Sequence, residues 1–96
     1  GQHMSEDLIT KGQNALALLN NPIFKESFLA VRKDLEDKIL SIKTTDKEAC
    51  ADLIRELQVL DAFERAIKIH IETGKFAAAE ASRMEKLKNK LRVFRR

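Results

Sequence analysis

The sequence predicts an all-α fold, in which an antiparallel hairpin of helices 22–43 and 46–73 is flanked by a short N-terminal helix and a basic C-terminal helix. Composition is the first indication, because one proline, no tryptophan, no tyrosine and 34% charged residues suit helices better than a sheet. The second is that apolar residues recur at intervals of three and four, as on one face of a helix. The third is that short polar clusters separate these periodic stretches.

The 96 residues are enough for one domain with a modest core. Residues 1–3 resemble the remnant of a cleaved purification tag, so we take Met4 as the native start and residues 4–96 as a single helical domain. No apolar run approaches the ~20 residues that span a bilayer, and no signal peptide is visible. We therefore expect production in the cytosol.

The first predicted helix covers about residues 6–20. Ser5 is the expected N-cap, and the acidic residues that follow it suit the positive end of the helix dipole. Gly12 lies on the apolar face, where another backbone could come close. The remaining residues of that face are Leu8, Ile9, Ala15, Leu16 and Leu19.

The second predicted helix begins at Pro22, after an asparagine pair that ends the first helix. Asn21 suits the N-cap position, and proline fits the first helical position because the amide it lacks would be unpaired there. Lys38 occupies one position of the apolar face, along which its aliphatic stem can lie. That face is otherwise formed by Phe24, Phe28, Val31, Leu35 and Ile42.

The third predicted helix, 46–73, is the longest element of the expected fold. Thr45 and Glu48 have the spacing of a capping box at its start, and Gly74 is the expected stop. At ~1.5 Å per residue this helix is about 42 Å long, whereas a compact chain of this size is about 32 Å across. We expect it to protrude or to need partners. Its apolar stripe is Leu53, Leu57, Leu60, Ile67 and Ile71.

Two charged residues interrupt the stripes of the hairpin, which should turn at 43–46. Lys38 interrupts the second helix and Glu64 the third, but antiparallel pairing does not place them opposite each other. For Glu64 this leaves two alternatives, an intermolecular partner or a solvent-facing end of the stripe.

The C-terminal helix, 76–94, carries a second apolar stripe of Met84, Leu87, Leu91 and Phe94. Continuing the earlier stripe through Gly74 would require an apolar residue at position 85, which is a glutamate. The observed stripe is shifted by one residue, or ~100° of helix rotation. We therefore expect a turn or kink at Gly74 and not one continuous helix.

The C-terminal segment is strongly basic. Residues 83–96 carry seven basic side chains against Glu85, a net charge of +6, whereas the rest of the chain is net −3. Such a helix could contact nucleic-acid phosphates, an anionic membrane or an acidic protein, or it could simply favour solubility. The candidate polyanion-binding residues are Arg83, Lys86, Lys88, Lys90, Arg92, Arg95 and Arg96.

No catalytic, cofactor-binding or metal-binding residues are predicted. Cys50 is the single cysteine and reads as a packed side chain, and His70 has no ligand-type residue three or four positions later. Residues 73–75, Thr-Gly-Lys, lack the second glycine and the hydroxyl of a phosphate loop, since Ile69 and Phe76 occupy those places. The segment therefore reads as a helix end.

Four segments resemble a set of small proteins encoded by tailed bacteriophages and prophages, over residues 8–80. They are Leu19-Asn20-Asn21-Pro22-Ile23-Phe24 with Phe28, Thr44-Thr45-Asp46, Leu57-Gln58-Val59-Leu60-Asp61 and Glu72-Thr73-Gly74-Lys75-Phe76-Ala77. Many of those proteins carry a tryptophan before the Thr-Thr turn, and residues 41–43 contain none. The resemblance implies a phage context, often among virion assembly genes, and no chemistry.

These observations favour a non-enzymatic protein that self-associates or binds a partner protein through the two apolar stripes, as a virion or assembly component in the host cytoplasm. The first alternative is a nucleic-acid-associated protein that uses the basic end. The second is a small inhibitor of a host or defence protein. We expect a homo-oligomer or a protein partner, and neither a cofactor nor a small-molecule substrate.

Overall fold

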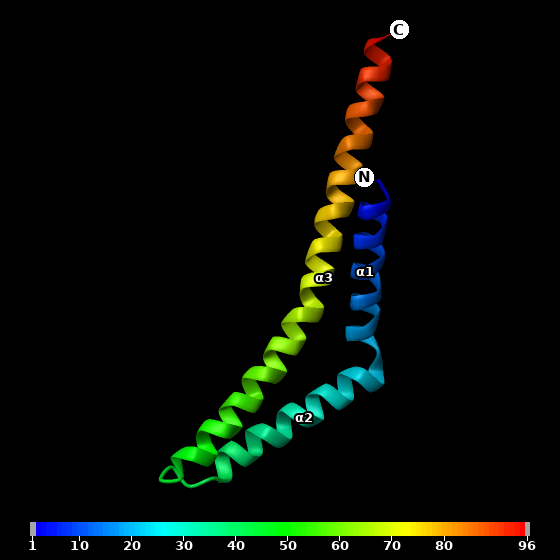
Figure 1. The fold of residues 1–96 in the computed structure, drawn as a ribbon. Coiled ribbons are helices and arrows are strands. Elements are labelled where there is room, and N and C mark those ends of the chain that lie inside the picture. The colour runs from blue at the N-terminus through cyan, green and yellow to red at the C-terminus, as the bar shows by residue number, and fades with distance from the viewer. Residues whose placement is uncertain (1, 96) are drawn as a thin grey trace. The chain divides into compact units, whose positions relative to one another are not determined.

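The computed structural model describes residues 2–95, and the side chains from residue 4 onward. Three helices make up this part of the chain: α1 (Gln2–Asn20), α2 (Pro22–Ser41) and α3 (Lys47–Phe94) (Figure 1). Residues 2–95 contain no strand, so the predicted all-α class is confirmed. The described chain divides into two compact units, and α3 contributes to both of them.

The junction between α1 and α2 has the predicted chemistry. The side chain of Asn21 accepts a hydrogen bond of 3.0 Å from the amide of Phe24, and Pro22 opens α2. Ser5, by contrast, lies inside α1, which begins at Gln2, so the predicted start of this helix is wrong. Neither glycine nor proline interrupts residues 2–5, and serine is tolerated inside a helix at a small cost.

The predicted turn between the hairpin helices is confirmed. Helix α2 ends at Ser41, and the amide of Ile42 donates to the carbonyl of Lys38 at 3.1 Å. The cap of α3 is Asp46, whose Oδ1 accepts from the amide of Ala49 at 3.2 Å. The predicted Thr45 capping box is therefore wrong by one residue, because aspartate caps better than threonine and its charge suits the helix N-terminus.

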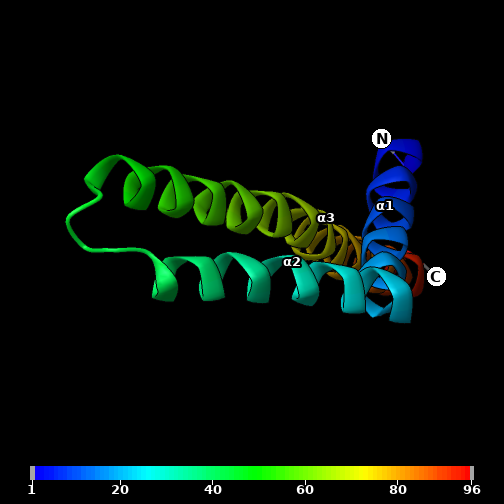
Figure 2. The same ribbon diagram turned by 90° about the horizontal axis from the view of Figure 1, so that it is seen from below.

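The first unit to consider, residues 17–67, contains the end of α1, helix α2 and the first part of α3. Figure 2 shows α2 lying along α3 in this unit. Leu35 and Ile67 are buried, with 8% and 9% of their surface exposed. The other residues of the first α3 stripe, Leu53, Leu57 and Leu60, are half-buried. The 4-3 spacing therefore predicted the covered face of α3 here.

One ion pair ties α2 to α3 in this unit. The guanidinium of Arg32 donates to the carboxylate of Asp61 and lies 5.6 Å from the ring centre of Phe28. The hydrogen bond to Asp61 raises the pKa of Arg32, and the nearby charge of Glu64 acts in the same direction. Glu64 is half-buried, so part of its electrostatic environment lies within its own chain.

Lys38 is held by its own helix. Its ammonium lies 3.0 Å from a carboxylate oxygen of Asp34, one turn earlier, and this hydrogen bond raises the pKa of Lys38. The side chain of Lys38 is 59% exposed, so its charge stays in contact with solvent.

The other unit, residues 1–16 and 68–96, is built on close contact between α1 and the second half of α3. A Cβ added to Gly12 would lie 2.8 Å from the carbonyl oxygen of His70 and 3.0 Å from Cα of Gly74. Ala15 and Ala77 are buried beside this contact, with 7% and 6% of their surface exposed. Small residues on both helices thus let the two backbones meet, as Gly12 led us to expect.

The predicted turn or kink at Gly74 is wrong. Helix α3 is continuous over 48 residues, so the expected helices 46–73 and 76–94 are one element. Gly74 has a negative φ, and glycine inside a helix costs only about 1 kcal/mol. Its role is to admit the backbone of α1, and the shift in the apolar pattern becomes a change of helix face.

Candidate functional site

The last turns of α3 carry an apolar stripe that the described part of the chain leaves uncovered. Met84, Leu87, Leu91 and Phe94 are 46%, 49%, 51% and 90% exposed. We call these four residues the C-terminal seam. Every described residue from 81 onward is exposed, because no other helix of the described chain covers these turns. The first predicted stripe, from Leu53 to Ile71, is instead buried or half-buried throughout.

The C-terminal seam overlaps one edge of the face that α1 covers. Ala77, which is 6% exposed, and Glu80, which is half-buried, precede Met84 and Leu87 by seven residues each. At about 100° per residue, Met84 lies within about 20° of Ala77, whereas Phe94 lies about 100° away. The seam therefore turns partly away from α1 toward its C-terminal end.

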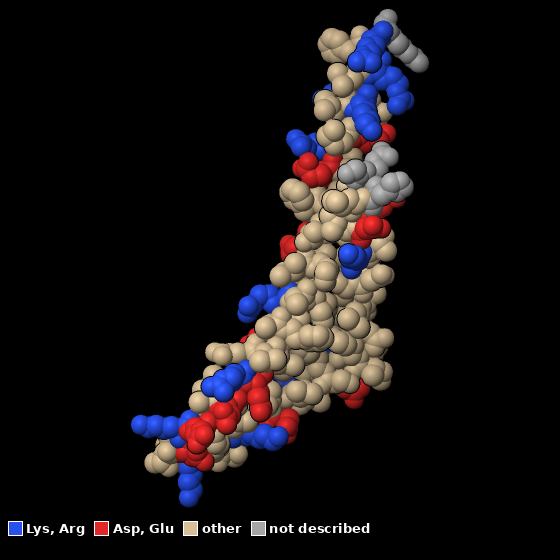
Figure 3. Space-filling model, viewed as in Figure 1, with Lys and Arg blue, Asp and Glu red and all other residues tan. Residues whose placement is uncertain are grey.

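Cations flank the seam on both sides. If Met84 and Leu91 are assigned to heptad position a, and Leu87 and Phe94 to position d, the four neighbouring e and g positions are all basic. Figure 3 shows basic side chains gathered at the C-terminal end of α3. Those at the flanking positions are Arg83, Lys88, Lys90 and Arg95.

The other predicted basic residues complete the positive charge of this segment. Lys86 and Arg92 are exposed on the turns that carry the seam, and Arg96 lies outside the described residues. Arg83 forms an ion pair of 2.9 Å with Glu80, one turn earlier. With its side chain 73% exposed, this contact holds the guanidinium loosely, because water and salt screen exposed pairs.

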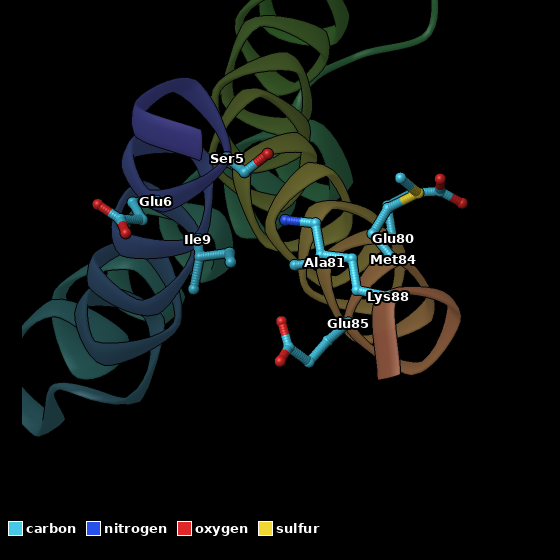
Figure 4. Close-up of a pocket in the computed structure, with 8 residues that line it drawn as sticks. All are labelled: Ser5, Glu6, Ile9, Glu80, Ala81, Met84, Glu85 and Lys88. Carbon is cyan, nitrogen blue, oxygen red and sulfur yellow. The ribbon is translucent and has the colours of Figure 1, made fainter. Parts of the chain in front are cut away.

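A groove of about 510 Å³ lies between the start of α1 and α3 (Figure 4). Met84 belongs to both the groove and the C-terminal seam. The lining is mixed, with Ser5, Glu6 and Ile9 from α1 facing Glu80, Ala81, Met84, Glu85 and Lys88 from α3. Sequence analysis did not identify the α1 side of this groove, since the alignment of α1 on α3 depends on the contact between Gly12 and Gly74.

The residues that were considered for chemistry in the sequence all lie within α3. The thiol of Cys50 is half-buried and donates to the carbonyl of Lys43 at 3.7 Å. His70 is exposed, and residues 73–75 lie inside α3 and form no loop. Among the described residues, no group of three or more His, Cys, Asp or Glu side chains could hold a metal ion.

None of the described helices combines the length and the apolar character that crossing a membrane requires. Comparison with protein-family models, with curated proteins and with solved structures gave no match to this chain. The C-terminal seam and its flanking cations are therefore interpreted from their own geometry and charge.

Proposed function

We propose that this protein works without catalysis, by self-association or by binding a partner protein through apolar helix faces that its own chain leaves open. The observation that supports this most directly is the C-terminal seam. Its four apolar side chains are spaced for helix–helix packing and are between 46% and 90% exposed on an intact helix. Exposed apolar residues in a continuous row mark an interaction site, whereas scattered ones are ordinary.

The amount of uncovered surface is large enough for such a role. The accessible surface is 8061 Å², whereas a folded monomer of 11.0 kDa has about 5,600 Å². The excess, roughly 2,400 Å², is well above the ~800 Å² that each partner buries in a standard interface. The chain thus covers less of its own surface than a compact domain of equal mass, which leaves apolar side chains open to a partner.

The resemblance to small phage and prophage proteins gives this proposal a context. A binding module of this kind fits a virion or assembly component acting in the host cytoplasm. In that setting its task is to join proteins.

The test combines sedimentation velocity of the full chain with photocrosslinking from position 90, beside the seam, in cells that produce it. We expect a sedimentation coefficient that rises with protein concentration, or a discrete crosslinked adduct. Leu87→Ser with Leu91→Ser should abolish that signal, whereas Lys86→Ser with Asn89→Ser alters the same turns away from the seam and should preserve it. A monomer at tens of micromolar that forms no adduct would refute the proposal.

Nucleic-acid binding is the second candidate, and the exposed cations of residues 83–95 favour it. Each phosphate neutralised releases counterions, so affinity for duplex DNA or RNA should fall steeply as salt rises. Lys88→Gln with Lys90→Gln should weaken binding, and Lys33→Gln, an exposed lysine on α2, serves as the control. A flat titration at low salt removes this candidate.

A further inference from the structure

We propose that the C-terminal seam binds an acidic amphipathic helix of a different protein and does not pair with a second copy of itself. This inference rests on the proposed function, because it specifies what covers the seam. It combines the width of the seam, the charges beside it and the point at which it ends.

The width of the seam fits one helix. At 100° per residue, the four positions fall within about 80° of the circumference of α3. A stripe of a and d positions this narrow packs against a single helix, whereas a surface helix facing a broad core or a membrane has a wider apolar face. The only further large apolar side chain on these turns, Val93, lies on the opposite side of α3.

The flanking charges disfavour pairing with a second copy. In a parallel pair, position g of one helix faces position e of the other, so Arg83 would meet Lys88 and Lys90 would meet Arg95. In an antiparallel pair, g faces g and e faces e, which again brings cations together. A helix with glutamate or aspartate at these positions would instead form an ion pair at each of them.

The apolar residues of the seam also argue against phosphates as the occupant. Contact with nucleic-acid phosphates would use the cations but leave Leu87, Leu91 and Phe94 exposed to water. An acidic amphipathic helix covers the apolar stripe and neutralises both flanks at once. The seam thus selects a partner that combines the two properties.

The seam ends at Met84 on its N-terminal side, and this end determines its length. Glu80 occupies the next d position toward the N-terminus, and its ion pair with Arg83 places a polar contact across the stripe. From Met84 to Phe94 the seam is about 16 Å long. An interface of three helical turns is small, so we expect binding of moderate strength that depends on salt.

Fluorescence anisotropy of the full chain with two labelled helical peptides tests this inference. Both peptides carry leucine at a and d, one has glutamate at e and g, and the other has lysine there. Duplex DNA and phosphatidylcholine–phosphatidylserine vesicles are the competing probes. At physiological salt we expect the glutamate peptide to bind roughly tenfold or more tightly than any other probe.

Two charge variants identify the face that is used. Lys88→Glu with Lys90→Glu should lose roughly tenfold in affinity for the glutamate peptide and gain affinity for the lysine peptide. Lys86→Glu with Arg92→Glu changes the net charge equally at positions b and c, away from the seam, and should retain the preference of the wild type. All four residues are exposed, and circular dichroism verifies that the helices remain.

Equal binding of both peptides, or tighter binding of DNA or vesicles at physiological salt, overturns the inference. So does self-association that Leu87→Ser with Leu91→Ser abolishes, although the proposed function would then stand. A chain that stays monomeric, forms no adduct and binds neither peptide removes both.

Discussion

Replacing Gly74 with alanine measures how closely α1 and α3 approach each other. In an isolated helix this change stabilises by about 1 kcal/mol, because alanine is the better helix former. In the folded chain the new Cβ would lie 3.0 Å from Cα of Gly12 and 3.0 Å from the carbonyl oxygen of Leu8. Both are backbone atoms and cannot rotate away, so the helices must separate.

The cost of that separation exceeds the gain in helix propensity. Overpacking a well-packed contact costs about 1–3 kcal/mol, and moving α1 outward also uncovers Ala15 and Ala77, which are 7% and 6% exposed. Subtraction of the propensity gain leaves about 0–2 kcal/mol, and the uncovering of the two alanines adds to this, so we expect Gly74→Ala to lower the free energy of unfolding by about 1–2 kcal/mol. At ~4–8 °C per kcal/mol, the melting temperature should fall by about 4–16 °C.

Urea and thermal unfolding followed by circular dichroism provide the measurement. The matched control is Ala79→Gly, at an exposed position of the same helix, which should lose about 1 kcal/mol through propensity alone. Gly12→Ala should behave like Gly74→Ala, because it introduces a Cβ 2.8 Å from the carbonyl oxygen of His70. If Gly74→Ala instead stabilises the chain by the amount that the control loses, the close contact does not exist.

Three further substitutions test other parts of the fold by the same assay. Asn21→Ala removes the cap of α2 and should cost about 1 kcal/mol, and an unchanged midpoint would show that the cap contributes nothing. Ile67→Ala should cost about 2–5 kcal/mol, whereas Ile69→Ala, at a residue 55% exposed, should cost far less, and similar losses would contradict the assigned face of α3. Asp61→Arg should destabilise by repelling Arg32, and adding Arg32→Asp should restore most of the loss. Failure of that charge swap to recover stability would show that the pair does not tie α2 to α3.

Helix boundaries were predictable where nearby side chains determine them. Asn21 and Pro22 mark the start of α2 because the cap and the fixed proline φ act within one turn of helix. The start of α3 was misplaced by one residue because Thr45 and Asp46 are both capping residues, and the sequence does not show which one accepts the hydrogen bond. The error in the start of α3 is only one residue because the two candidate caps are neighbours in the sequence.

Gly74 was misinterpreted for a different reason. A glycine after a long periodic stretch has the same local sequence whether it ends a helix or admits a neighbouring backbone. Here the second role applies, and its partner, Gly12, lies far away in the sequence. Two features of the sequence could have indicated this contact. Position 74 falls on the extended apolar stripe of α3, and a glycine was already noted on the apolar face of α1.

The candidate site was predictable in its residues but not in its exposure. The spacing from Met84 to Phe94 and the cations beside it are visible in the sequence. Whether another helix covers them depends on where α1 aligns along α3, which the glycine contact determines. How the seam lies relative to the face that α1 covers follows only once α3 is known to be continuous.

The limited burial of this chain also has a calorimetric consequence. Unfolding exposes roughly 7,900 Å², compared with about 10,300 Å² for a compact monomer of equal mass, because the unfolded chain exposes about 1.45 Å² per dalton. The heat-capacity increment and the urea m-value scale with this area, so both should be about a quarter below the values usual for this chain length. The lone chain should accordingly have a broad, flat dependence of stability on temperature. Binding of another helix buries more surface, so it should increase the heat-capacity increment and make stability depend more steeply on temperature.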